Sequence, residues 1–128
     1  MATVLVIDDD DDVRRLLARA LAQTYDVLEA GDAETAFAVL ASHTPDVILC
    51  DVMLPAMNGL DFVRHLRARD GGRHVPVIFL TAKTGAMDVV EGINAGARAY
   101  VAKPIKLAPL LDRIARIVAA GSRIPPPL

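Results

Sequence analysis

Acidic, hydroxyl and amine side chains follow four separate apolar runs of the sequence. Asp8 and Asp9 come directly after the first run, and Asp51, Thr81 and Lys103 come after three later ones. Crowded carboxylates repel one another unless a cation neutralises them, and hard oxygen ligands around a small open site suit Mg²⁺. An aspartate beside such a metal can attack phosphorus, while a lysine and a hydroxyl can hold phosphoryl oxygens. These residue types therefore indicate metal-assisted phosphoryl chemistry.

The acidic residues are unevenly distributed along the chain. Lys and Arg number 14 against 16 Asp and Glu, which leaves a formal net charge of −2. Five aspartates form the single run Asp8–Asp12, and the chain without this run would carry 14 − 11 = +3. Asp10, Asp11 and Asp12 precede an expected helix, where aspartate caps free N–H groups, so we assign Asp11 and Asp12 to capping or solvation. The nearly balanced total argues against a surface built to coat nucleic acid.

Short apolar runs alternate with amphipathic patterns. Five runs are predicted to be strands: Val4–Ile7, Val27–Ala30, Val47–Cys50, Val77–Leu80 and Ala99–Ala102. Four of them are nearly continuous in apolar character, as expected of strands buried on both faces of a parallel sheet. The stretches between them show helical spacing, less regularly at Ala86–Ala95, where Gly92 weakens the pattern. This alternation predicts a doubly wound α/β sheet, whose ligands bind outside the carboxyl ends of the strands.

The length and the cysteine content limit the remaining classes. A chain of 128 residues is the size of one domain, which we place at residues 1–120, followed by a Pro-rich tail or truncated linker at residues 121–128. Cys50 is the one cysteine; it cannot form an internal disulfide, and we expect it to pack in the core rather than act as a nucleophile. The N-terminus does not have the pattern of a secretion signal, and no apolar run reaches the length of a membrane span. We therefore expect a soluble, cytoplasmic protein.

Taken together, the motifs at these strand ends resemble the receiver domain of two-component response regulators. The resemblance covers about residues 3 to 120, and its motifs lie at Val4–Asp10, at Pro45–Pro55 with Asn58-Gly59, at Val77–Ala82 and at Gly96–Pro104. It implies a flavodoxin-like five-stranded parallel sheet of order 2-1-3-4-5 with helices on both faces. It also implies a signalling module rather than an enzyme.

The resemblance implies a role for each residue of the acidic site. Asp51 would be the phosphoacceptor, taking a phosphoryl group from a sensor histidine kinase or a His-containing phosphotransfer protein. Mg²⁺ would be bound by Asp51 and Asp9, with Asp8 alongside, often through water, and by the backbone carbonyl of Met53. The cofactor expected from the resemblance is therefore Mg²⁺.

The resemblance further implies a switch. Thr81 and Lys103 would contact the phosphoryl group, and the Lys103–Pro104 bond would be cis. Thr81 would move toward the phosphoryl oxygens and Tyr100 would turn inward, remodelling the surface of the fourth helix, the fifth strand and the last helix. Without the resemblance, Tyr100 reads as an ordinary half-buried strand residue. The expected partners are the phosphoryl donor, a downstream protein or output domain, and a phosphorylation-dependent second copy, with no direct contact to nucleic acid or membrane.

Two other classes compete with this interpretation. A phosphatase resembling the haloacid dehalogenase superfamily also uses Mg²⁺ and an aspartyl phosphate, and Asp9–Val13 fits its first motif. That family needs a late acidic pair, however, whereas Asp112 alone follows Lys103, and it would leave Asp51 unexplained. A pure interaction module with a decayed phosphorylation site is the third class, and no missing site residue supports it.

Overall fold

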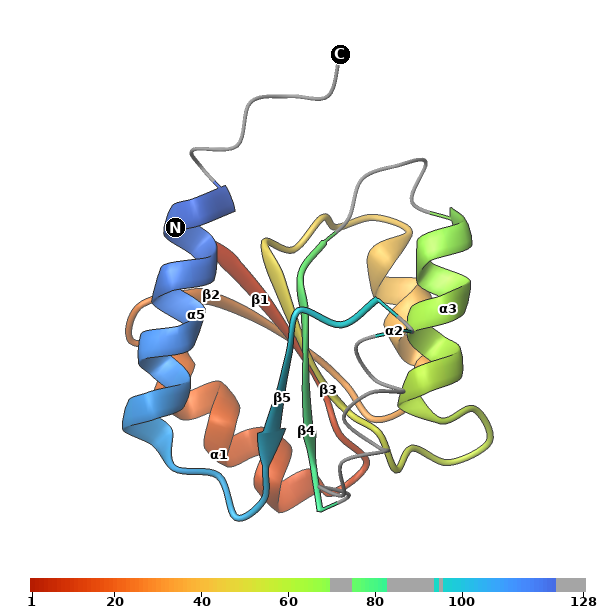
Figure 1. Cartoon of the computed structure of the whole chain (residues 1–128), viewed down its shortest axis with the longest axis horizontal. Helices are drawn as coiled ribbons and strands as arrows, with labels where there is room; N and C mark the ends of the chain where they lie inside the picture. The colour runs from red at the N-terminus through yellow and green to blue at the C-terminus, as the bar shows by residue number, and fades with distance from the viewer. Residues whose placement is uncertain (70–74, 83–93, 95, 122–128) are drawn as a thin grey trace.

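A central parallel sheet organises the chain. The computed structural model describes residues 1–69, 75–82, 94 and 96–121, and its ribbon is shown in Figure 1. The five strands follow the order β2-β1-β3-β4-β5, and every neighbouring pair is parallel. The elements are β1 (Thr3–Ile7), α1 (Asp11–Leu21), β2 (Asp26–Ala30), α2 (Ala33–Leu40), β3 (Val47–Asp51), α3 (Gly59–Arg69), β4 (Val77–Thr81), β5 (Ala99–Ala102) and α5 (Leu107–Gly121). The predicted fold class and strand order are confirmed.

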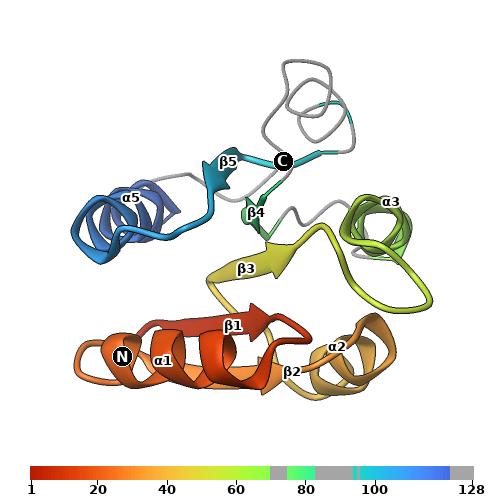
Figure 2. The same ribbon diagram turned by 90° about the horizontal axis from the view of Figure 1, so that it is seen from below.

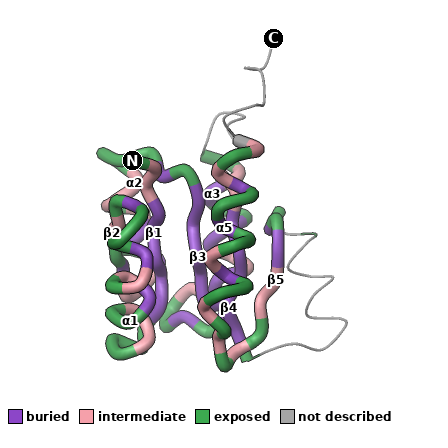
Figure 3. Tube along the Cα trace, turned by 90° about the vertical axis from the view of Figure 1, so that its left-hand side faces the viewer, coloured by how far each residue is buried: buried purple, intermediate pink, exposed green. Residues whose placement is uncertain are grey.

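Helices cover both faces of the sheet. Seen along the sheet in Figure 2, α1 and α5 lie on one side and α2 and α3 on the other. Side chains of β1 alternate between the two layers: Leu5 and Ile7 belong to the cluster with α2 and α3, whereas Val4 and Val6 belong to the cluster with α1 and α5. Strands β3 and β4 are buried along their whole length (Figure 3). This double burial explains why their sequences are almost continuously apolar.

The strand register brings the chemically active residues to one edge. Asp51 at the end of β3 lies opposite Leu80, and Thr81 at the end of β4 lies opposite Ala102, directly before Lys103. Within the sheet, β2 lies beside β1 on one side and β3 lies beside β1 on the other, so the strand order reverses between β1 and β3. Ligands of open α/β sheets bind at such a reversal, outside the carboxyl ends of the strands.

Two sequence expectations concern parts of the chain that are not described. The helix expected at Ala86–Ala95 lies, apart from Asn94, outside the described residues, as does the tail beyond Gly121. Within the described ranges, none of the helices is long and apolar enough to span a membrane.

Candidate functional site

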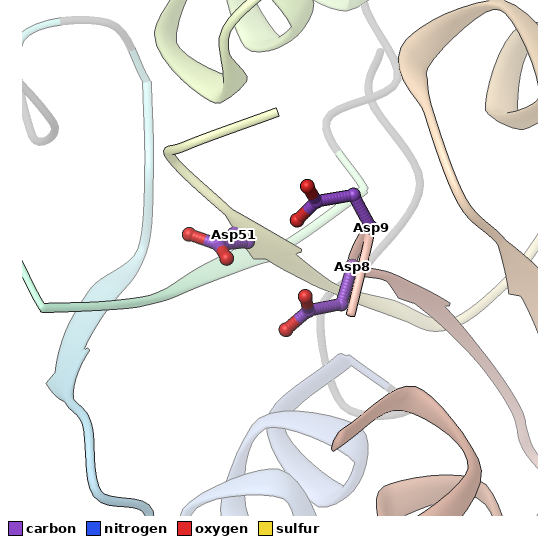
Figure 4. A group of neighbouring side chains, drawn as sticks. All are labelled: Asp8, Asp9 and Asp51. Atoms are coloured by element: carbon purple, nitrogen blue, oxygen red, sulfur yellow. The ribbon is translucent and has the colours of Figure 1, made fainter. Parts of the chain in front are cut away.

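Three aspartates form an acidic pocket at the carboxyl edge of the sheet. Asp8 and Asp9 follow β1 and Asp51 ends β3, and one carboxylate oxygen from each lies within 4.8 Å of the others (Figure 4). Asp8 is 1% exposed and Asp51 is 5% exposed, whereas Asp9 is exposed to solvent. Hard oxygen donors at this spacing, with one of them open to water, are the ligand set that Mg²⁺ accepts.

One lysine joins the two buried aspartates. The Nζ of Lys103 donates hydrogen bonds of 2.9 Å to Oδ2 of Asp8 and of 2.9 Å to Oδ2 of Asp51. The Lys103–Pro104 peptide bond is cis, and the backbone N–H of Lys103 donates to the carbonyl of Thr81 at 3.0 Å. Among the residues that the structure describes, three carboxylates therefore face the one ammonium group of Lys103, which leaves them with an excess of negative charge when all three are ionised.

The electrostatics of the pocket follow from burial and pairing. Burial raises the pKa of Asp8, and this effect outweighs the hydrogen bonds from Lys103 and from the backbone of Asp10, which lower it. Burial alone would lower the pKa of Lys103, but its hydrogen bonds to Asp8 and Asp51 raise it. Lys103 consequently remains charged at neutral pH, and the ionised form of Asp8 is held at a cost in free energy.

The loop between β1 and α1 separates the five-aspartate run into two roles. Asp10 is the N-cap of α1, and its Oδ1 accepts from the backbone N–H groups of Asp12 and Val13 at 3.0 and 3.2 Å. The N–H of Asp10 donates in turn to Oδ1 of Asp8 at 3.0 Å. Asp11 lies in the first turn of α1. The residue that caps α1, Asp10, therefore also orients the Asp8 carboxylate of the pocket.

The loop between β3 and α3 holds Asp51 from the other side. The backbone N–H of Met53 donates to Oδ1 of Asp51 at 2.9 Å, and Met53 is 57% exposed. Gly59 begins α3 against the strand end: a Cβ placed there would lie 2.5 Å from the carbonyl oxygen of Asp51 and 2.9 Å from Cα of Val52. The absence of a side chain at residue 59 therefore allows α3 to start beside Asp51.

The two expected switch residues lie on neighbouring strands. Thr81 is fully buried at the end of β4, and Tyr100 is half-buried on β5. The Tyr100 ring contacts Phe79 edge to face, with ring centroids 6.1 Å apart. Cys50 is also buried, and burial raises the pKa of its thiol far above the ordinary range, so it packs as a core residue.

The structure brings Asp8, Asp9, Asp51 and Lys103 together, and it adds Arg14, which the sequence reasoning did not single out. The guanidinium of Arg14 donates to the backbone carbonyl of Asp8 at 2.9 Å. Its sequence position on the first turn of α1 carries no signal of this contact, because the side chain reaches back to a residue in the preceding loop.

A parallel sheet of order 2-1-3-4-5 with an acidic pocket and a lysine at its carboxyl edge defines a class of phosphoryl-accepting signalling domains. The chain belongs to the response regulator receiver domain family, whose sequence model matches residues 4–115. Receiver domains are modules of two-component signalling that interact with histidine kinases, and they are not catalytic enzymes. This membership sets aside the phosphatase alternative.

Curated relatives and solved structures agree with this assignment. The DNA-binding response regulator MtrA of Mycolicibacterium smegmatis is 42% identical over 112 residues, which cover 87% of this chain and 48% of MtrA. The response regulator PleD of Caulobacter vibrioides is 40% identical over 114 residues, or 88% of this chain and 25% of PleD. The chain thus spans half or less of the length of these relatives.

Among solved structures, the chemotaxis protein CheY4 of Vibrio cholerae superposes with a TM-score of 0.86 at 32% identity, covering 91% of this chain and 98% of CheY4. The BeF3-activated DrrB receiver domain has a TM-score of 0.84 at 28% identity, covering 93% of this chain and 98% of that receiver-domain chain.

Proposed function

We propose that Asp51 is the phosphoacceptor of this receiver domain. The observation that carries the proposal is the placement of the Asp51 carboxylate, which lies in the acidic pocket and 2.9 Å from the ammonium group of Lys103. An aspartate that is oriented by a backbone N–H on one oxygen and by a cation on the other is positioned for attack on phosphorus.

The reaction is a phosphoryl transfer between a phosphohistidine and a carboxylate. A carboxylate oxygen of Asp51 forms the new O–P bond, the P–N bond of the phosphohistidine breaks, and the imidazole leaves with the electron pair of that bond. Lys103, which contacts Asp51, would balance the charge of the phosphoryl oxygens, and the hydroxyl of the buried Thr81 would donate to one of them. The donor is a sensor histidine kinase or a His-containing phosphotransfer protein in the cytoplasm.

The residues present fit Mg²⁺. Asp8, Asp9 and Asp51 offer carboxylate oxygens within 4.8 Å of one another, and Lys103 supplies one positive charge against the three of them. These three carboxylates, with the backbone carbonyl of Met53, would hold the ion. Bound Mg²⁺ supplies charge neutralisation for the phosphoryl oxygens, and Asp8 and Asp9 serve to hold it beside Asp51.

Phosphorylation would change the surface of β5 and α5 through Thr81 and Tyr100. A phosphoryl group adds about −1.5 to −2 charges at Asp51. Thr81 would move toward the new oxygens, and Tyr100, now half-buried against Phe79, would turn inward into the space left behind. The altered surface would then bind a downstream protein, an output domain or a second phosphorylated copy.

The experiment that tests this function is intact-mass spectrometry after incubation with acetyl phosphate and Mg²⁺. We expect the wild type to gain one phosphoryl group, Asp51→Asn to gain none, and the control Asp112→Asn to behave as the wild type, because Asp112 is exposed on α5 and pairs with Arg116. An adduct mapped to Asp9, or no adduct on the wild type, would overturn the assignment.

A further inference from the structure

Arg14 connects three parts of the structure around the acidic pocket. Its Nη1 donates to the backbone carbonyl of Asp8 at 2.9 Å, its Nε to Glu29 on β2 at 3.2 Å, and its Nη2 to Asp11 at 2.6 Å. The Arg14 side chain is 14% exposed. A single guanidinium therefore ties the β1–α1 loop to the first turn of α1 and to the neighbouring strand.

The contact with the Asp8 carbonyl determines the direction of the next residue. The peptide unit from Cα of Asp8 to Cα of Asp9 is planar, so a carbonyl held in place also holds the N–H and Cα of Asp9. The N–H of Asp8 is held as well, by the carbonyl of Ala30 at 3.1 Å. Asp9 is the exposed member of the pocket, and Arg14 fixes the backbone from which its carboxylate extends toward Asp51.

We propose that Arg14 is a positioning residue for the acidic pocket, acting through the Asp8–Asp9 peptide unit on the carboxylate of Asp9. This inference rests on the proposed function, because it concerns the ion that the pocket would hold. The two carboxylates that Arg14 contacts, those of Asp11 and Glu29, balance its charge. Arg14 is therefore expected to affect Mg²⁺ binding through the geometry of the pocket rather than through repulsion between the guanidinium and the ion.

A lysine cannot replace this arginine. A guanidinium presents its donors in a planar fork, which reaches a carbonyl and two carboxylates from one fixed orientation, whereas an ammonium is a point charge on a flexible stem. Arg14→Lys thus keeps the charge and removes the geometry, which separates the two effects. Arg15→Lys is the matched control, because Arg15 is the next residue of α1 and is exposed.

The test measures Mg²⁺ affinity and backbone protection. We expect Arg14→Lys to raise the Kd for Mg²⁺ about 10-fold, as is typical when a group that orients a metal ligand is lost. In metal-free protein, the Asp10 N–H, which donates to Asp8 at 3.0 Å, should exchange several-fold faster in the variant. Arg15→Lys should change neither the Kd for Mg²⁺ nor the exchange rate of the Asp10 N–H.

The outcomes separate this inference from the proposed function. If Arg14→Lys binds Mg²⁺ with wild-type affinity and shows wild-type exchange at Asp10, the positioning role is wrong. If the wild type takes no phosphoryl group, the proposed function fails, while the affinity and exchange measurements still decide the role of Arg14. If Arg14→Lys does not fold, Glu29→Gln is the second variant, because it weakens one of the three contacts of Arg14. It should raise the Kd for Mg²⁺ to a smaller extent and speed exchange of the Asp10 N–H. Wild-type exchange in Glu29→Gln would then overturn the positioning role.

Discussion

Removing the ammonium group of Lys103 should make the stability of the domain depend more strongly on Mg²⁺. Lys103 contacts Asp8, whose side chain is 1% exposed, and Asp51, whose side chain is 7% exposed, each at 2.9 Å. In Lys103→Met the stem keeps its approximate volume, but both carboxylates lose their cation and face each other. The substitution therefore leaves two buried, uncompensated charges in the metal-free protein.

The size of the effect follows from this burial. Removing one partner of a buried ion pair destabilises a protein by about 3–5 kcal/mol. Because the Lys103 side chain is 22% exposed, water can enter the vacated space, and we reduce the expected loss to about 2 kcal/mol. The pKa of Lys103 is raised above its ordinary value of 10.5, so its contribution is complete at pH 7 and is lost only as the pH rises through the folded-state pKa.

Urea unfolding of the wild type and of Lys103→Met, in EDTA and in Mg²⁺, measures the loss of stability and its dependence on the ion. In EDTA the variant should be less stable by about 2 kcal/mol. Mg²⁺ at 100 times its Kd stabilises a binding protein by about 2.7 kcal/mol, and at one shared concentration it should stabilise the variant more, because the repulsion between Lys103 and the ion is gone. Lys106→Met, an exposed lysine nearby, should change stability by less than about 0.5 kcal/mol. Equal stability of Lys103→Met and wild type in EDTA would refute the reasoning.

Two further substitutions probe the same edge of the sheet. Gly59→Ala places a Cβ against backbone atoms of Asp51 that cannot rotate away, so the free energy of unfolding measured in urea titrations should fall by about 2 kcal/mol. The control Gly31→Ala should be nearly neutral, because its Cβ meets only the end of a flexible side chain at 3.4 Å. Equal effects of the two substitutions would contradict the packing argument. Asp8→Asn should stabilise the metal-free protein at pH 7, because burial raises the pKa of Asp8 and its ionised form lowers stability. This gain should shrink as the pH falls from the raised folded-state pKa toward the ordinary value of 3.8, and a gain that does not change with pH would contradict it.

The strands and the convergence of the site could be predicted because both depend on short-range patterns. Val47–Cys50 is apolar at every position, as expected of a strand buried on both faces, and β3 lies at the centre of the sheet. Once parallel strands are assigned, residues directly after them must meet at one edge, whatever the details of packing. That rule alone brings Asp8, Asp51 and Lys103 together.

The contacts that orient these residues could not be predicted in the same way. The side chain of Arg14 reaches back from the first turn of α1 to the carbonyl of Asp8 in the preceding loop, and such a contact has no periodic signature in the sequence. Gly59 is recognisable only through the family motif, since its close approach to Asp51 depends on where α3 begins in space. Both contacts are set by tertiary geometry, which local propensity does not encode.

The pocket gains its capacity to bind a cation from the same features that reduce its stability. Burial disfavours the ionised form of Asp8, and one ammonium group cannot balance Asp8, Asp9 and Asp51 together. Lys103 contacts the two buried carboxylates while Asp9 stays exposed, so an incoming ion meets an excess of negative charge. The backbone that carries these aspartates is held by the contacts of Arg14 and Asp10 with Asp8. A pocket without this excess would be more stable and would bind the ion more weakly, because binding energy is largest where the unliganded charges are least compensated.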